Sequence, residues 1–562
     1  MLARARAIRN ARRKYFRRSC PMKKALRTIL LAVTAILLIA VLSACQQGGT
    51  QKPDDDKKPE EVCTHNWVKE TTVSGTCIAK GYEKYVCTLC GETKNEPTSL
   101  GTHTYVNHVC TVCGKRQEGD ATYTSGETKV YVYTASASIS GDKTYLMVID
   151  GNGKTADYEK GKQPWASYLE TVKELVVANG VTRIGNNVLN GASILKKATL
   201  SDTCSEIGDG AFSGCVMLDE FIAGEGVARV GARAFAGCVS AKELLFPAST
   251  VHFGTGAFAG CEKLRSMSIG LPSEESAEEP FFGKMFGEGD GRQKFRFDEN
   301  GRNYSFAVPK TLIYLEIKGN GKIARNAFQG CDGIKKITLS GAITEIEKEA
   351  FRGCQGLREF IFGEKSQETL TKIDKYAFEG CKLLGAEPEK KDEGFMQFTL
   401  PKSLVTIEDF AFKNCIGMVS ADVSATGITT LPRGAFAGCT ALKELTLPES
   451  LQSIGAEAFE NSGLEKIKIG KNVDGIGKNA FNDCSRLTEI YIDSETICAR
   501  ADGDASRLFD IGRTYVFLAK DIGSKAWIET NAPRGFVGTK CRFKAYDEKT
   551  GYYAWEVKNE KN

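Results

Sequence analysis

The chain has 562 residues and a formal net charge of +5. The positive charge is concentrated at the start, because residues 1–44 contain 11 Lys or Arg and no acidic residue. Without this segment the net charge changes from +5 to about −6, which argues against nucleic acid as a partner.

The segment "MKKALRTILLAVTAILLIAVLSAC" (22–45) has the pattern of an export signal, with a positive start followed by an apolar run. The run of about 16 apolar residues is shorter than the roughly 20 that a membrane span needs, which argues against the alternative of a plain transmembrane anchor. The letters L-S-A-C at its end match a lipobox. We therefore expect lipidation of Cys45 and a signal peptide over 1–45, with Met22 as the favoured true start.

Residues 46–62 are polar and predict a disordered tether between the lipid and the folded parts. The lipid chains on Cys45 would then hold the protein stably at a membrane.

A Cys- and His-rich module follows over residues 63–118 and contains an internal duplication. "THNWV" and "VCTLCG" in its first half match "THTYV" and "VCTVCG" in its second. A C-x-x-C-G pair presents two thiolates to one tetrahedral Zn²⁺. A short segment with few large apolar residues cannot form much hydrophobic core, so it needs a metal ion or disulfides to stabilise its fold. The pattern predicts structural zinc, with His108 as a further choice beside the ligand candidates Cys63, His65, Cys87, Cys90, Cys77, His103, Cys110 and Cys113.

Two alternatives remain for this module: disulfides, because six cysteines in an exported segment can pair, and an unstapled linker. The module is similar to the zinc-ribbon-like repeats found beside tethers in exported bacterial proteins. That resemblance implies a closed, structural metal site without catalysis.

From about residue 186 to 498 the pentapeptide A-F-x-x-C recurs, most often at a spacing of 23 residues. "LKELTLPESLQSIGAEAFENSGL" (442–464) is the clearest copy of the whole unit. It predicts a short half-buried strand, a stop at Pro448, a second apolar pair and a tight turn whose Phe points inward. One unit cannot bury its apolar side alone, but stacked units can.

This pattern resembles the BspA-like (Treponema pallidum-type) leucine-rich repeats of bacterial surface proteins. The resemblance begins near Lys129 and implies a right-handed solenoid of about twelve coils of ~23 residues, built from short parallel strands and turns. We expect an N-terminal cap and first coil over 123–185, with Trp165 as its aromatic plug, an insertion at about 271–310, and a C-terminal capping segment over 499–562.

The repeated Phe residues predict one continuous buried ladder. The cysteine that closes each pentapeptide is expected to be a buried thiol that packs as a small apolar residue, rather than a disulfide. The Phe residues of the predicted core ladder are Phe212, Phe235, Phe258, Phe328, Phe351, Phe378, Phe412, Phe436, Phe459 and Phe481.

The segment "PFFGKMFG" (280–287) within the insertion has two interpretations. Its aromatic residues could form an exposed interaction patch, or they could pack the insertion back onto the stack, which is the favoured interpretation.

No catalytic motif is present: no histidine begins H-E-x-x-H, and the phosphate-loop and calcium-loop resemblances near Gly153 each lack a required residue. We therefore expect no enzyme. The sequence predicts a cell-surface lipoprotein that binds an extracellular protein or glycan, and the family resemblance implies adhesion. The alternatives are an accessory part of an exported hydrolase and a structural surface-coat protein.

Overall fold

The structure is a computed structural model. It describes residues 66–74, 80–89, 91–100, 102, 104–106, 108–113, 115–137, 143–271, 281–296, 303–387, 397–492, 514–519, 539–547 and 552–559. The chain divides into two compact units, residues 1–117 and 118–562.

The first unit is built from antiparallel strands. Its three-stranded sheet has the order β1-β2-β3, and a separate short hairpin follows it. The strands are β1 (Trp67–Val73), β2 (Lys80–Cys87), β3 (Thr93–Leu100), β4 (Tyr105–Val106) and β5 (Val109–Cys110).

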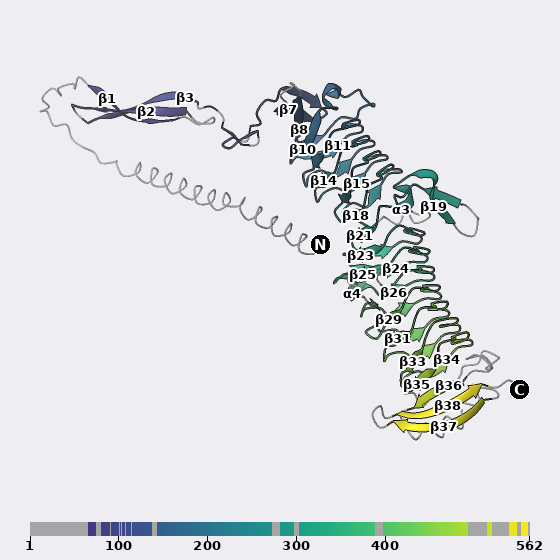
Figure 1. Cartoon of the computed structure of the whole chain (residues 1–562). Coiled ribbons are helices and arrows are strands. Elements are labelled where there is room, and N and C mark those ends of the chain that lie inside the picture. The colour runs from purple at the N-terminus through teal and green to yellow at the C-terminus, as the bar shows by residue number, and fades with distance from the viewer. Residues whose placement is uncertain are drawn as a thin grey trace, which may run out of the picture. The chain divides into compact units, whose positions relative to one another are not determined.

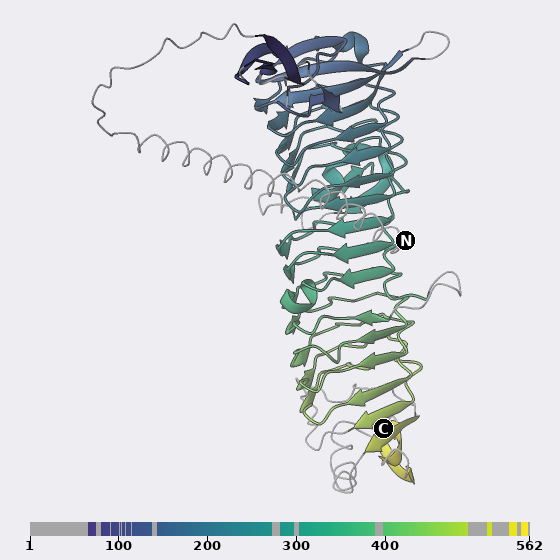
Figure 2. The ribbon, with the colours of Figure 1, turned by 90° about the vertical axis from the view of Figure 1, so that its left-hand side faces the viewer.

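The second unit is a β-solenoid of about 14 turns with little helix, and its coils are visible as a stack in Figures 1 and 2. The turn count exceeds the number of A-F-x-x-C pentapeptides because some turns use other residues. "VLNGA" (188–192) occupies one of them: the Leu189 N–H donates to the Ala211 carbonyl at 2.8 Å, as the Phe212 N–H donates to the Ala234 carbonyl at 2.8 Å. Trp165 is fully buried in the first coil, and its Nε1 donates to the Val188 carbonyl at 3.0 Å.

One strand of each coil contributes to a long ladder. Its first sheet has 11 strands and begins with the antiparallel strands β6 and β7, and its last sheet ends with the antiparallel pair β38 and β37. Between these ends the paired strands are parallel, and within each sheet a strand pairs with the equivalent strand of the next coil, as Lys197 does with Glu220. The ladder is broken between β25 and β27 and again between β31 and β33. The strands are β6 (Ala121–Ser125), β7 (Thr128–Ala137), β8 (Lys143–Gly151), β10 (Val172–Val177), β12 (Lys197–Thr199), β14 (Glu220–Ile222), β16 (Glu243–Leu245), β18 (Ser266–Ile269), β21 (Tyr314–Ile317), β23 (Lys336–Leu339), β25 (Glu359–Phe362), β27 (Phe398–Thr399), β29 (Ser420–Asp422), β31 (Glu444–Thr446), β33 (Lys466–Ile469), β35 (Glu489–Ile492), β36 (Thr514–Ala519), β37 (Thr539–Asp547) and β38 (Tyr552–Asn559).

The other strand of each coil contributes to a second, shorter ladder, which is interrupted at the insertion. One sheet of it ends at β17, and the next begins at β22. Its strands are β9 (Gly153–Lys154), β11 (Val181–Ile184), β13 (Glu206–Ile207), β15 (Arg229–Val230), β17 (His252–Phe253), β22 (Gly321–Ile323), β24 (Ile343–Ile346), β26 (Lys372–Ile373), β28 (Thr406–Ile407), β30 (Thr430–Leu431), β32 (Ser453–Ile454) and β34 (Gly475–Ile476). Among the described residues of this unit, three short helices lie beside the coils: η1 (Ala166–Tyr168), α3 (Phe281–Lys284) and α4 (Ser366–Thr369).

The insertion supplies a turn of its own. The Phe258 N–H donates to the Met285 carbonyl at 2.8 Å, and the Phe282 N–H donates to the Ala327 carbonyl at 3.2 Å, so α3 and the residues after it bridge two coils. The apolar residues Phe281, Phe282, Met285 and Phe286 are buried. An exposed aromatic patch at this segment is therefore wrong, and packing onto the stack is confirmed. The hairpin of β19 (Glu288–Arg296) and β20 (Asn303–Phe306) leaves the side of the stack beside α3 (Figure 1).

Candidate functional site

The interior of the solenoid contains a column of stacked Phe rings. The structure places all ten ladder residues in the core with no exposed area. Neighbouring rings such as those of Phe328 and Phe351 lie nearly parallel, with centroids 5.3 Å apart. At the insertion, Phe286 and Phe282 continue the column between Phe258 and Phe328, with centroid separations of 6.0, 5.4 and 5.3 Å. This column joins each coil to the next through buried ring contacts.

A second column, of cysteine thiols, runs beside the rings. Seven of these Sγ atoms donate to the carbonyl oxygen of the Phe one turn earlier, for example from Cys354 to Phe328 at 3.1 Å and from Cys439 to Phe412 at 3.2 Å. Cys215 donates to the Leu189 carbonyl at 3.5 Å, because Leu189 stands where later turns have Phe. Burial raises the pKa of Cys261 to about 12 and that of Cys204, which lies outside the pentapeptides, to about 11. Cys261 and Cys204 therefore stay protonated at neutral pH and are poor nucleophiles and poor metal ligands.

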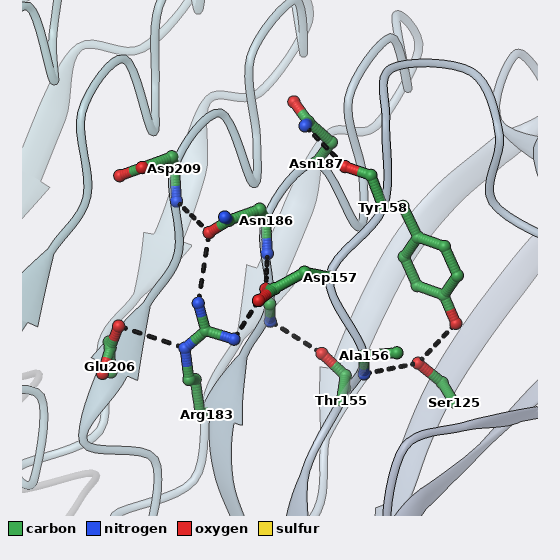
Figure 3. A network of polar contacts seen from close by, with 11 residues as sticks. Ser125, Thr155, Ala156, Asp157, Tyr158, Arg183, Asn186, Asn187, Glu206 and Asp209 are labelled. Atoms are coloured by element: carbon green, nitrogen blue, oxygen red, sulfur yellow. Dashed lines mark hydrogen bonds and ion pairs between the residues drawn. The ribbon is translucent and has the colours of Figure 1, made fainter.

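The first coils are joined by a polar network (Figure 3). Asn186 Oδ1 accepts hydrogen bonds from Arg183 Nη2 at 3.1 Å and from the Asp209 N–H at 2.8 Å. Arg183 also forms ion pairs with Asp157 at 2.7 Å and Glu206 at 3.0 Å. Partial burial acts to raise the pKa of Asp157, but the Asn186 N–H and the Arg183 guanidinium lower it overall. These groups hydrogen-bond and form ion pairs with one another across three successive coils. The network therefore has a structural role, which is to join these coils.

The turns need a backbone conformation that L-amino acids seldom adopt. The residue just before the A-F pair has a positive φ in turn after turn. Gly and Asn tolerate this left-handed region best. The residues at this position are Asn187, Gly210, Arg233, Gly256, Asn326, Glu349, Tyr376, Phe410, Gly434, Glu457 and Asn479.

Two adjacent turns carry an aromatic ring at this position. Tyr376 has φ 58° and Phe410 has φ 60°, and both side chains are only half-buried. Their rings are stacked, with centroids 5.4 Å apart and an interplanar angle of 6°. A residue with a Cβ costs on the order of 1 kcal/mol or more in this region, and Tyr376 and Phe410 are the two members of the series with aromatic side chains.

Cations border this pair of rings. Arg352, from the preceding turn, lies 5.7 Å from the Tyr376 ring centroid. Arg433, from the following turn, lies 5.5 Å from the Phe410 centroid, and Lys413 lies 4.9 Å from it. We call Arg352, Tyr376, Phe410 and Arg433 the aromatic column.

Carboxylates fix the two arginines of the aromatic column. Glu457 accepts hydrogen bonds from Arg433 Nε at 3.1 Å and from Arg433 Nη2 at 2.9 Å. Arg352 Nε lies 2.7 Å from Glu379 Oε2. The aromatic column is thus a surface cluster with fixed charges. Sequence reasoning missed it, although the letters "KYAF" (375–378) and "DFAF" (409–412) place an aromatic residue where other turns have Gly, Asn or a charged residue.

Only part of the predicted metal module is described by the structure. Cys87 and Cys110 are buried and Cys113 is exposed, whereas Cys63, His65, Cys77, Cys90 and His103 lie outside the described residues. Within the described residues, no group of three or more His, Cys, Asp or Glu is placed to hold a metal ion.

The predicted lipidation residue Cys45 also lies outside the described residues. No helix in the described part of the chain has the length and apolar character needed to cross a membrane. His252 is half-buried on β17 and faces Arg229 in the register of the shorter ladder.

Solved structures with the same repeat resemble this chain at low identity. A leucine-rich repeat protein from Bacteroides ovatus is 19% identical, with a TM-score of 0.32, and the match covers 64% of this chain and 92% of that one. A leucine rich cell surface protein from Faecalibacterium prausnitzii is 20% identical, with a TM-score of 0.21 and coverage of 66% and 94%. The leucine rich repeat protein of T. pallidum is 17% identical, with a TM-score of 0.22 and coverage of 45% and 87%. Comparison with curated protein sequences gave no match.

The repeats themselves match a known family. Residues 167–284, 302–388 and 390–488 match the BspA type leucine rich repeat region in 6 copies, and these ranges make up more than half of the 562 residues. The chain therefore belongs to the BspA type leucine-rich repeat family.

Proposed function

We propose that the protein is an exported, lipid-anchored binding protein that captures an extracellular protein with the surface of its solenoid. The observation that carries this proposal is the aromatic column. Tyr376 and Phe410 keep strained backbone conformations and half-exposed rings where Gly or Asn would fit without strain. Strain of this kind is retained where a side chain is needed for function, and Tyr and Arg are common residues at the energetic centres of protein interfaces.

The arrangement of the rings favours a protein ligand over a glycan. A sugar ring binds by lying flat on an aromatic face, but the Tyr376 and Phe410 faces are stacked on each other. Arg352 and Arg433 border the pair from the turns on either side. Ring edges and guanidinium groups remain for contact, and these suit a protein surface with carboxylates and carbonyl groups.

The anchoring part of the proposal rests on the sequence. The apolar run, the L-S-A-C letters and the polar tether over 46–62 together have the order that a lipoprotein requires. Export and a lipid on Cys45 would present the solenoid to ligands outside the cell.

The test compares ligand capture by the wild-type chain and by a Tyr376→Asn, Phe410→Asn double variant. Both would be immobilised and exposed to extracellular-matrix proteins and to a glycan array. We expect a protein ligand whose binding is weakened at least tenfold in the double variant, because both ring edges are removed. Asn479→Gly changes the same turn position at a site without an aromatic residue and is the matched control.

Three results would contradict the proposal: equal binding by the double variant, equal loss in the Asn479→Gly control, or binding to glycans alone. The double variant relieves two strained backbone positions while it loses one ring stack. We expect its thermal stability to stay close to that of the wild type, so a loss of binding would not reflect unfolding.

A further inference from the structure

The column of cysteine thiols contains two uninterrupted runs. Within a run, each pentapeptide is joined to the next by backbone hydrogen bonds, such as the one from the Gly330 N–H to the Arg352 carbonyl at 2.7 Å. A run ends where a turn has no cysteine: Ala192 precedes the first run, the insertion turn separates the two, and Ser462 follows the second. The first run is Cys215, Cys238 and Cys261, and the second is Cys331, Cys354, Cys381, Cys415 and Cys439.

Neighbouring thiols of a run make the same contact one coil apart. Cys238 Sγ donates to the Phe212 carbonyl at 3.3 Å. Cys261 Sγ, in the next coil, donates to the Phe235 carbonyl at the same distance. Equivalent residues of adjacent parallel strands are roughly 4.8 Å apart, and cysteines joined by a disulfide have Cα atoms about 4.4–6.8 Å apart. Neighbouring cysteines of a run are therefore close enough to form a disulfide.

Side chains of the column also contact one another directly. Ser462 occupies the cysteine position of its turn, and its Oγ lies 3.3 Å from Cys484 Sγ in the next coil. A thiol at one position of the column can thus reach the side chain at the next position. The thiol pairs that interact directly in the second run are Cys331 with Cys354, Cys354 with Cys381, and Cys415 with Cys439.

The surroundings of the two runs protect the thiols without isolating them from each other. All eight side chains are buried, with at most 1% of their area exposed, and the structure holds them as thiols. A large oxidant is excluded from this core, whereas a peroxide is small enough to diffuse into it. Buried thiols react slowly, because the reactive species is the thiolate. Once one thiol has reacted, however, its neighbour is already in place.

We propose that the two runs are oxidation sites, in which a peroxide converts neighbouring thiols into disulfides that link one coil to the next. With hydrogen peroxide, one thiol takes up an oxygen atom to become a sulfenic acid, and one water molecule leaves. The neighbouring Sγ then attacks the sulfenic sulfur. The S–S bond forms, the S–O bond breaks, and the released hydroxyl group takes the thiol proton as a second water molecule. The two thiols lose two electrons, which reduce the peroxide to water.

Such a disulfide would stabilise the solenoid and remain reversible. It links two coils and restricts the unfolded chain, which favours the folded state. In a relaxed disulfide the Cβ atoms are about 3.5–4.5 Å apart, whereas equivalent Cβ atoms of parallel strands keep the strand spacing of roughly 4.8 Å. The coils must approach slightly, so the bond is strained and a mild thiol reductant should open it.

The odd length of each run sets the number of disulfides. A run of three cysteines forms one disulfide and a run of five forms two, whichever neighbours react first, and one thiol remains in each run. Removing Cys354 isolates Cys331 and leaves three neighbours, so Cys354→Ser should form one disulfide in the second run instead of two. Cys331→Ser is the matched control. It removes an equally buried thiol from the same run, but it keeps the pairs Cys354–Cys381 and Cys415–Cys439, and should still form two.

The experiment uses the full chain, purified under reductant, freed of it and treated with hydrogen peroxide. Remaining thiols are alkylated in denaturant, and disulfide-linked peptides are identified by mass spectrometry. We expect links between neighbouring members of each run, and a higher thermal midpoint that dithiothreitol reverses. Ser462→Cys extends the second run, so links from position 462 to Cys439 or Cys484 should appear in this variant alone. Hydrogen exchange during the reaction should show that the solenoid stays folded.

Several results would overturn the proposal. Sulfinic or sulfonic acids in place of disulfides would show that a neighbouring thiol does not capture the sulfenic acid. Links between cysteines that are not neighbours, or links that form only when the chain is heated to unfolding, would show that the column does not direct the reaction. Equal disulfide counts in Cys354→Ser and Cys331→Ser would contradict the run lengths. None of these outcomes depends on the proposed ligand-binding function of the solenoid.

Discussion

Removing one ring from the Phe column should produce a local and large loss of stability. Phe351 is fully buried, and its ring lies between those of Phe328 and Phe378, with centroids 5.3 Å away on each side. Phe360 adds an edge contact at 5.0 Å. Truncating a buried Phe to Ala costs roughly 3–5 kcal/mol, and three ring contacts place Phe351→Ala toward the upper end of that range.

The loss should remain confined to nearby coils, because each coil contacts only its neighbours. Hydrogen exchange followed by mass spectrometry reads this directly: β23, β25 and β26 should exchange faster, while β10 and β34 should keep their protection. Leu245→Ala is the control, since Leu245 is 45% exposed and its truncation should change stability by less than about 0.5 kcal/mol. A cost below about 1 kcal/mol, or equal acceleration along the whole solenoid, would refute the reasoning.

Three further outcomes follow from the described geometry and the sequence. Burial raises the pKa of Cys204 from 9.0 to about 11, so the unfolded chain loses this thiol proton at a lower pH than the folded chain does. The free energy of unfolding, measured by guanidinium titration, should therefore fall as pH rises from about 9 to about 11, by up to about 1.4 kcal/mol per pH unit. This slope should be smaller in Cys204→Ala. Gly434→Ala should destabilise the solenoid by more than about 1 kcal/mol in the same titration, because Gly434 has φ 60° and the new Cβ would lie 2.3 Å from the Phe410 ring. Gly470→Ala is the control and should not destabilise the solenoid in this way, because no atom lies within 4 Å of its new Cβ. Mass spectrometry of the membrane-extracted protein should find a lipid on an N-terminal Cys45, and Cys45→Ala should release or mis-process the protein; an unmodified Cys45 would contradict the anchoring proposal.

Residues that recur could be placed from the sequence. The A-F-x-x-C spacing predicted a stacked solenoid with an apolar ladder. Every copy of the repeat has the same kind of neighbours, so the role assigned to a residue in one copy can be checked against the equivalent residue in the next copy. The structure has this stack, with Phe212 and Phe481 near the ends of a column that is buried throughout. The pentapeptide count came out below the number of turns, since Val188 and Leu189 fill one turn with other side chains.

Features that occur once were harder to predict. The part played by Phe282 and Phe286 in the ring column depends on how the insertion folds back, which no repeat specifies. Tyr376 and Phe410 were missed for a different reason. The strain at these two residues comes from a positive φ, and the sequence indicates that φ only once the equivalent positions in most other turns are seen to hold Gly or Asn.

The one-repeat register of the ladders has an evolutionary consequence. Arg229 pairs with His252, and Lys466 pairs with Glu489, each partner lying 23 residues further along the chain. A gene that gains or loses one such unit by unequal recombination brings each remaining strand against an equivalent of its former neighbour. The length of the protein can therefore change by whole coils at little cost to folding, because the junction is always of the same kind. If the proposed function holds, the length of the solenoid and its surface area for ligands would change by whole repeats, while a single unit that carries unusual side chains, such as Tyr376, could diverge on its own.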